Sequence, residues 1–168
     1  MRRVWQVGLA AVAASAALAG GVAAATGHDN GHPGKKGTRS ERLELAGPVQ
    51  DLVRVDVGDP GAGPGDYAVF RYDIFTQGKS PTRVGDAFVK CVTQFPPAGS
   101  QCEAVTRLPG RGDITFQGLA PQDLTQDYVL AITGGTGDFS NVRGELLIHT
   151  VSLAPLTQRF TLDLFGVR

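Results

Sequence analysis

The sequence has little cysteine, histidine or tryptophan: its 168 residues include 2 Cys, 3 His and 1 Trp. Structural zinc sites of the common types need four Cys or His ligands at short spacings, and two cysteines do not make such a quartet. The hydrolase motif Gly-x-Ser-x-Gly, the protease motif His-Glu-x-x-His and the complete P-loop pattern are also missing. We therefore predict no metal, no cofactor and no hydrolase chemistry.

The N-terminal segment 1–25 has the pattern of a secretory signal peptide. Met1-Arg2-Arg3 is a basic start, residues 4–25 carry no charge, and Ala23 and Ala25 form an Ala-x-Ala cleavage signal. A retained membrane anchor is the alternative, but the segment is rich in Ala and Gly rather than Leu and Ile, which makes it a weak span. We predict cleavage, an extracellular protein and no membrane contact afterwards.

Residues 26–40, TGHDNGHPGKKGTRS, contain no large apolar side chain and predict a flexible linker. His28 and His32 are four residues apart, but they need a helix to come together, and Gly31 and Pro33 disfavour one. The remaining residues 41–168 suffice for one domain with a single core. They hold 11 Lys and Arg against 15 Asp and Glu, a net charge of −4, so we predict no nucleic-acid partner.

The domain shows no sustained helical periodicity. Short runs rich in Val, Ile, Phe, Tyr and Thr alternate with Gly, Pro and Asp clusters, a pattern typical of antiparallel β-structure. We predict strands at 43–57, 66–76, 83–95, 101–108, 112–119, 127–133, 144–154 and 158–166. The only tryptophan, Trp5, lies in the leader, so the Cys and Trp spacing of immunoglobulin sandwiches is absent. We predict a closed eight-stranded antiparallel β-barrel, since closure removes exposed edges.

The period of two assigns an inside and an outside to these strands. In 66–76, Phe70, Tyr72 and Ile74 share one face, and in 83–95 Val89 and Cys91 do the same. Cys91 and Cys102 are an even pair in a predicted exported protein, separated by a turn-forming Pro-Pro-Ala-Gly segment. We predict a disulfide across a hairpin that contributes about 2–3 kcal/mol to stability.

The glycine-rich stretch 132–146, ITGGTGDFSNVRGEL, has two interpretations. A dinucleotide site needs Gly-x-Gly-x-x-Gly followed by a helix, but Ser140 takes the third glycine position and a strand-like alternation follows. We therefore predict a strand-to-strand corner with Phe139 packed on the barrel end. Arg111-Gly112-Asp113 matches an adhesion tripeptide, yet it lies beside Pro109-Gly110, and we interpret it as a strand connection.

These residues resemble a known family. GDITFQG at 112–118, YVLAITGGTGDF at 128–139 and Val142-Arg143-Gly144 are similar to the Gly-Gly-(Ser/Thr)-Gly-x-Phe-x-x-(Ala/Val)-x-Gly region of allene oxide cyclases and dirigent proteins. The similarity extends upstream through GDYAVFRYDIFT at 65–76. The resemblance implies an eight-stranded barrel, commonly a homotrimer. It also implies a site inside the barrel that holds a reactive apolar molecule, such as a lipid or polyphenol, in one conformation.

Position by position, the resemblance implies two candidate catalytic residues. Asp56 stands near the glutamate that the cyclases carry at the end of the first strand, and Tyr72 stands at a polar pocket position. Phe70, Ile74 and Val89 are the predicted ligand-pocket residues. Cys91 matches a pocket cysteine, but a disulfide with Cys102 would remove its thiol.

Each candidate also has a non-catalytic interpretation. Asp56 is then a solvated carboxylate, and Tyr72 is an ordinary core residue. His149 is expected to be structural, and Arg71 with Asp73 a surface pair of small energetic consequence.

Two functions stay open at this point. In the first, the barrel binds a small apolar molecule and steers its cyclisation, isomerisation or coupling. In the second, the protein is a non-enzymatic extracellular barrel that binds a ligand or partner and has a filled core. Whether the protein is an enzyme is left undecided by the sequence.

Overall fold

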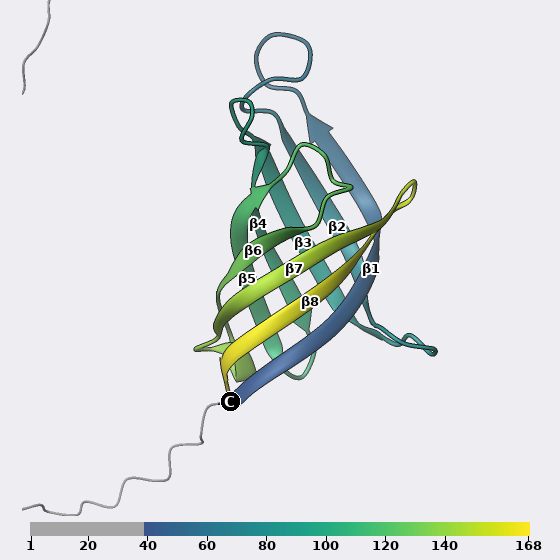
Figure 1. The fold of residues 1–168 in the computed structure, drawn as a ribbon, viewed down its shortest axis with the longest axis vertical. Helices are drawn as coiled ribbons and strands as arrows, with labels where there is room; N and C mark the ends of the chain where they lie inside the picture. Colours follow the sequence, from purple (N-terminus) through teal and green to yellow (C-terminus); the bar gives the residue numbers. More distant parts are fainter. Residues whose placement is uncertain (1–38) are drawn as a thin grey trace, which may run out of the picture. The chain divides into compact units, whose positions relative to one another are not determined.

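A computed structural model describes residues 39–168 (Figure 1). The predicted signal peptide, His28, His32 and most of the predicted linker lie outside the described residues. The eight strands are β1 (Arg39–Val55), β2 (Tyr67–Thr76), β3 (Arg83–Thr93), β4 (Ser100–Leu108), β5 (Gly112–Ala120), β6 (Tyr128–Gly135), β7 (Arg143–Leu153) and β8 (Leu156–Val167). Within residues 39–168, no helix has the length and apolar character needed to cross a bilayer.

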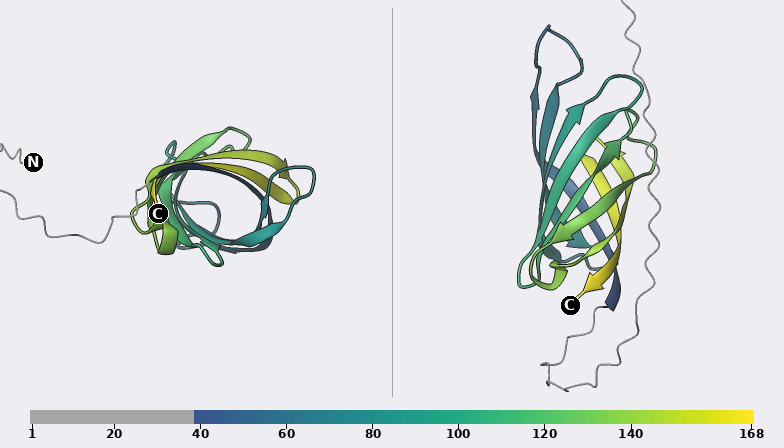
Figure 2. Two further views of the ribbon diagram at one scale, coloured as in Figure 1. Left: turned by 90° about the horizontal axis from the view of Figure 1, so that it is seen from below. Right: turned by 90° about the vertical axis from the view of Figure 1, so that its left-hand side faces the viewer.

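The strands close into a barrel in which each strand pairs antiparallel with the next and β8 pairs with β1. Figure 2 shows this ring in the view along the barrel. The closed eight-stranded barrel predicted from the sequence is confirmed, and every predicted strand is present within a few residues of its predicted bounds. β1 starts earlier than predicted because Arg39 and Ser40 already pair with Val167 and Phe165 of β8.

Alternation along the strands sorts side chains as predicted. Tyr72 and Ile74 of β2 are buried in the barrel. Arg71, the residue before Tyr72, points outward, where its guanidinium donates to Asp51 at 2.6 Å and to Asp73 at 3.2 Å. These exposed pairs contribute little to stability, so the barrel is held together by its backbone ladders and its inner face.

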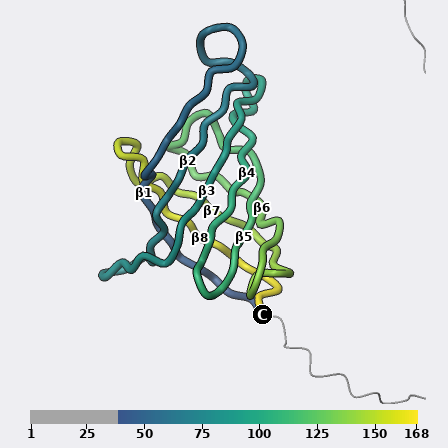
Figure 3. The backbone as a smooth tube through the Cα atoms, turned by 180° about the vertical axis from the view of Figure 1, so that it is seen from behind, coloured from purple at the N-terminus to yellow at the C-terminus, as the bar shows by residue number. Residues whose placement is uncertain are grey.

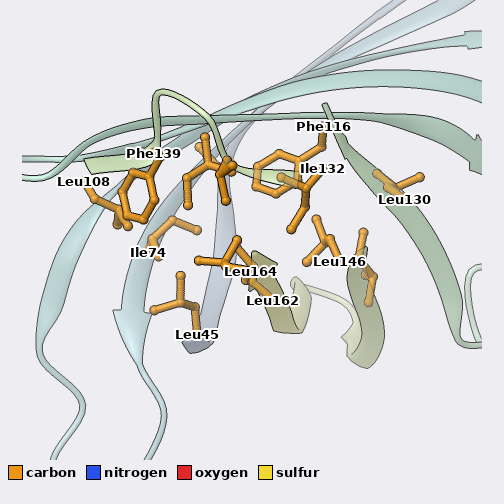
Figure 4. Close-up of a cluster of buried hydrophobic side chains, with 14 of the residues drawn as sticks. Leu45, Ile74, Leu108, Phe116, Leu130, Ile132, Phe139, Leu146, Leu162 and Leu164 are labelled. Carbon is orange, nitrogen blue, oxygen red and sulfur yellow. The ribbon is translucent and has the colours of Figure 1, made fainter. Parts of the chain in front are cut away.

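The glycine-rich stretch forms the predicted corner between β6 and β7, and it closes one end of the barrel. A 3₁₀ turn, η1 (Gly137–Phe139), follows Gly135, and Gly137 has a φ of 59°, which glycine adopts without strain. Phe139 is completely buried with Val142, Leu108 and Ile74 in the hydrophobic cluster. Figure 4 shows Phe139 beside Leu108 at one side of this cluster. After this single turn the chain enters strand β7 rather than an α-helix, which excludes a dinucleotide-binding loop here.

The Arg-Gly-Asp tripeptide belongs to the same closed end. The guanidinium of Arg111 donates to both carboxylate oxygens of Glu41 at 2.8 Å and to Asp138 at 3.3 Å, and it stacks 4.7 Å from the Phe139 ring centroid. Asp113 accepts from Arg107 at 3.4 Å. The tripeptide therefore holds together the β4–β5 connection, as its interpretation as a strand connection implies.

The opposite end of the barrel carries the β1–β2, β3–β4, β5–β6 and β7–β8 connections. The β1–β2 connection, residues 56–66, projects furthest from the C-terminus (Figures 1 and 3). This end has no counterpart of the buried Phe139 turn. The candidate functional site opens at this end.

Candidate functional site

A cavity of about 560 Å³ occupies the barrel interior and extends to the end that carries the β1–β2 connection. Its wall is mainly apolar because the inward positions of neighbouring strands hold aliphatic and aromatic residues. These include Phe70, Ile74, Ala87, Val89, Ala104, Phe116, Leu130, Ile148, Phe160 and Leu162. The filled core expected under the non-enzymatic hypothesis is therefore not observed.

Polar side chains interrupt this apolar wall in a few places, and four of them are joined by hydrogen bonds. The Tyr72 hydroxyl donates to Gln158 Oε1 at 2.8 Å. The Gln158 amide nitrogen donates to Thr150 Oγ1 at 3.1 Å and to the Tyr128 hydroxyl at 3.4 Å. Tyr72 and Gln158 are only 5% and 3% exposed. We call Tyr72, Tyr128, Thr150 and Gln158 the inner polar cluster.

Strand order places the two central members of the inner polar cluster together. β1 lies between β8 and β2, and Gly47 of β1 is paired with Gln158. A side chain at Gly47 would collide with the backbone carbonyl of Asp73, so the glycine lets β1 and β2 approach closely here. Phe160 packs edge-on against the Tyr72 ring, with centroids 5.7 Å apart.

Burial makes both phenols of the inner polar cluster weaker acids than free tyrosine. Removal from water raises the pKa of Tyr72 far above its usual value of 10, and the neighbouring Tyr128 adds to the rise. Burial also raises the pKa of Tyr128, partly offset by the hydrogen bond from Gln158. Both groups are therefore neutral hydrogen-bonding phenols at physiological pH.

The structure brings all the predicted site residues to one cavity, but at two depths. Phe70, Tyr72, Ile74 and Val89 line its interior wall. Asp56 lies at the mouth, exposed and beyond the end of β1 rather than inside the strand as predicted, and its Oδ2 accepts from Gly61 N at 3.0 Å. Asp56 has no hydrogen bond to the inner polar cluster, so the two candidate catalytic residues are not adjacent partners.

The charged residues of the cavity lining gather around the mouth. They are Arg54, Asp56 and Asp66. Asp66 accepts from Val57 N at 2.8 Å and from Gly63 N at 2.7 Å, and these backbone hydrogen bonds lower the pKa of its carboxyl. The interior wall consists of neutral side chains, and in residues 39–168 no group of three or more His, Cys, Asp or Glu side chains is placed to hold a metal ion.

The predicted disulfide is present. Cys91 of β3 and Cys102 of β4 are directly opposite each other in the ladder, and their sulfurs are bonded. The residues 94–99 form the connection between them, as the Pro-Pro-Ala-Gly segment indicates. Both cysteines line the cavity, and because the thiol of Cys91 is consumed in the bond, it is not available as a nucleophile.

The sequence interpretation missed Gln158, Tyr128 and Thr150. A signal for Gln158 exists: it occupies the same face of β8 as Phe160, Leu162 and Leu164, so a glutamine stands in an otherwise apolar inward row. His149 is outside the cavity and exposed, with Nδ1 2.7 Å from Asp127 Oδ1.

Known structures share this barrel. The chain aligns with a pyocyanin demethylase at 28% identity and a TM-score of 0.63, covering 74% of this chain and 99% of that one. It aligns with the pterocarpan synthase dirigent protein GePTS1 at 13% identity and a TM-score of 0.63, covering 85% and 98% of the two chains.

A third similar structure is the Diels-Alderase AbmU from Streptomyces koyangensis, at 16% identity and a TM-score of 0.64. The alignment covers 76% of this chain and 64% of the Diels-Alderase. No protein-family model matches the sequence, and no curated protein matches it either. The chain therefore has the fold of the dirigent and cyclase barrels, the fold that its glycine-corner resemblance implied.

Proposed function

We propose that this protein binds a small, largely apolar molecule inside the barrel and holds it in one orientation, so that its cyclisation, isomerisation or coupling follows one course. The observation that carries this proposal is the mainly apolar cavity of about 560 Å³ with a few polar groups in its wall, among them the inner polar cluster. Small-molecule sites typically measure about 300–1,000 Å³ and combine an apolar lining with a few placed polar groups.

Such a cavity suits catalysis by orientation rather than by strong acids or bases. The interior wall is neutral, and the phenols of Tyr72 and Tyr128 stay protonated at physiological pH. Fixing a flexible reactive molecule near its productive conformation removes much of the entropic barrier to ring closure. The inner polar cluster would set the direction in which the molecule lies.

Aromatic side chains favour a flat ligand. Phe70, Phe116 and Phe160 line the cavity together with Tyr72 and Tyr128, and aromatic faces and edges pack well against planar rings. The pyocyanin demethylase among the similar structures makes pyocyanin, a planar phenazine, the first probe to use. A polyphenol fits this wall better than a long-chain lipid.

Secretion and trimer formation are part of the proposal. The Cys91–Cys102 disulfide suits an oxidising extracellular compartment. Gel filtration with light scattering measures the assembly, and N-terminal sequencing of protein from the culture medium tests cleavage after Ala25.

A cavity-filling substitution tests the binding site directly. Ala104 lines the cavity, whereas its neighbour Val105 lies on the outer face of β4. We expect Ala104→Phe to weaken pyocyanin binding, measured by calorimetry, at least tenfold, and Val105→Phe to leave it unchanged. Equal binding by wild type and Ala104→Phe would place the ligand elsewhere and overturn the proposal.

The role of Tyr72 separates catalysis from binding alone. Mass spectrometry of natively purified protein identifies a co-purifying molecule, and turnover is then followed with Tyr72→Phe and Asp56→Ala. Loss of turnover with retained binding in Tyr72→Phe supports steering of a reaction. Because Asp56 is exposed at the mouth and bonded to Gly61 N, we expect Asp56→Ala to affect ligand entry more than the reaction itself.

A further inference from the structure

The hydrogen-bond inventory of the inner polar cluster leaves one donor unused. Both ends of the Gln158 amide are hydrogen-bonded: Oε1 accepts from Tyr72, and the amide nitrogen donates to Thr150 and Tyr128. The Tyr72 hydrogen is committed to Gln158. The Tyr128 oxygen receives a hydrogen bond, but no acceptor for its own hydroxyl hydrogen exists among residues 39–168.

An unused donor inside an apolar wall marks the place where a ligand acceptor belongs. Tyr128 lines the cavity and is half-buried. A buried donor without a partner costs about 1–3 kcal/mol, and in folded proteins such groups nearly always find an acceptor. A bound molecule with a suitably placed acceptor atom removes that cost.

Charge restricts which acceptor fits. The interior wall holds no cationic side chain, and the only arginine in the lining, Arg54, is at the mouth. An anionic oxygen beside Tyr128 would be buried without compensation, which is strongly unfavourable. A neutral carbonyl oxygen accepts from a phenol without this penalty.

We propose that Tyr128 recognises the ligand by donating its hydroxyl hydrogen to a neutral ketone- or quinone-type oxygen, and that the ligands of this barrel are planar aromatic carbonyl compounds. This inference rests on the proposed function. The raised pKa of Tyr128 agrees with it, because the phenol keeps its hydrogen throughout the physiological range. Tyr128 is then a specificity-determining residue within the inner polar cluster.

Two probes of the same shape test this proposal. Fluorenone and fluorene are planar tricyclic molecules that differ in a carbonyl against a methylene group. We expect the whole protein to bind fluorenone about two- to tenfold more tightly than fluorene, the range of a net neutral hydrogen bond. Calorimetry or equilibrium dialysis measures both affinities.

Variants then assign the preference to one hydroxyl. Tyr128→Phe should bind the two probes equally, with fluorene affinity as in wild type. Tyr67→Phe is the control. Tyr67 also lines the cavity, but it is not part of the inner polar cluster, and the Lys90 ammonium lies 5.4 Å from its ring centroid. This variant should keep the preference. Thermal unfolding checks that each variant is folded.

The outcomes separate the inference from the proposed function. If both probes bind wild type equally, or if the preference survives Tyr128→Phe, the role of Tyr128 is overturned while the binding cavity stands. The same holds if Tyr72→Phe alone removes the preference, since Tyr72 is then the donor. If neither probe binds and pyocyanin does not bind either, the proposed function fails and the inference fails with it.

Discussion

The two ends of this barrel are built from the same eight strands but are stabilised in different ways. At the closed end, Phe139 fills the barrel between Leu108, Val142 and Ile74, and the Arg111–Glu41 bridge lies above it. At the open end, the inward side chains leave a cavity between them. There the Cys91–Cys102 disulfide and the carboxylates that accept loop amides hold the structure.

This difference shows how a small barrel combines a stable fold with a hollow site. Dense packing contributes most where nothing has to bind, and every removed methylene there leaves a void. Where a ligand has to enter, a covalent bond and backbone hydrogen bonds order the chain without filling the space. Four experiments measure this contrast, from the largest expected effect to the smallest.

Removing an aromatic ring should cost far more at the closed end. Phe139→Ala creates a void in a fully packed region, and we expect a loss of about 3–5 kcal/mol in the free energy of unfolding. Phe70→Ala only enlarges an existing cavity, and we expect a loss of about 1–2 kcal/mol. Urea unfolding measures both, and similar losses would show that the two ends are packed alike.

Removing the disulfide should loosen the open end alone. We expect the double variant Cys91→Ser, Cys102→Ser to lose about 2–3 kcal/mol, because the bond links two residues 11 positions apart and restricts the unfolded chain between them. Hydrogen exchange should rise in residues 94–99 and stay unchanged around Phe139. A thiol titration of unfolded, unreduced wild type should find no free thiol, and two free thiols would contradict the Cys91–Cys102 disulfide.

Breaking the ion pair at the closed end should have a smaller effect. Hydrogen bonding from Arg111 lowers the pKa of Glu41 below its usual 4.5. The contribution of the Glu41–Arg111 ion pair to folding stability is therefore complete above pH 4.5. It is lost as the pH falls through the lowered folded-state pKa of Glu41. We expect Glu41→Gln to cost about 1 kcal/mol at pH 7. Glu103→Gln, at an exposed position, is the control and should cost nothing measurable. If both variants lose the same stability, the loss in Glu41→Gln does not come from the contact with Arg111.

The smallest effect should be local to the mouth of the cavity. The amides of Val57 and Gly63 lower the pKa of Asp66 below 3.8. The stabilisation by these two hydrogen bonds is present above pH 3.8 and is lost as the pH falls through the folded-state pKa of Asp66. We expect Asp66→Asn to speed proteolysis within residues 56–66 at neutral pH while the melting temperature changes little. Unchanged proteolysis would show that other contacts order this connection.

Much of this molecule was predictable because the signals are local. Alternation along 66–76 placed Phe70, Tyr72 and Ile74 on the inner face, and the turn between Cys91 and Cys102 set the two cysteines opposite each other. The glycine corner predicted the burial of Phe139. Asp56 was assigned to the first strand, but the chain leaves β1 at Val55 and turns Asp56 toward Gly61 N.

The sequence by itself determined the strands, their inner faces, the disulfide and the corner, because each depends on residues a few positions apart. Only the tertiary structure decided that Tyr72 meets Gln158 across 86 residues and that Arg111 meets Glu41 across 70. It also decided that one end is filled and the other hollow. Closure of the barrel sets which distant inward positions face each other, and a cavity depends on the summed volumes of side chains from all eight strands, which no single segment contains.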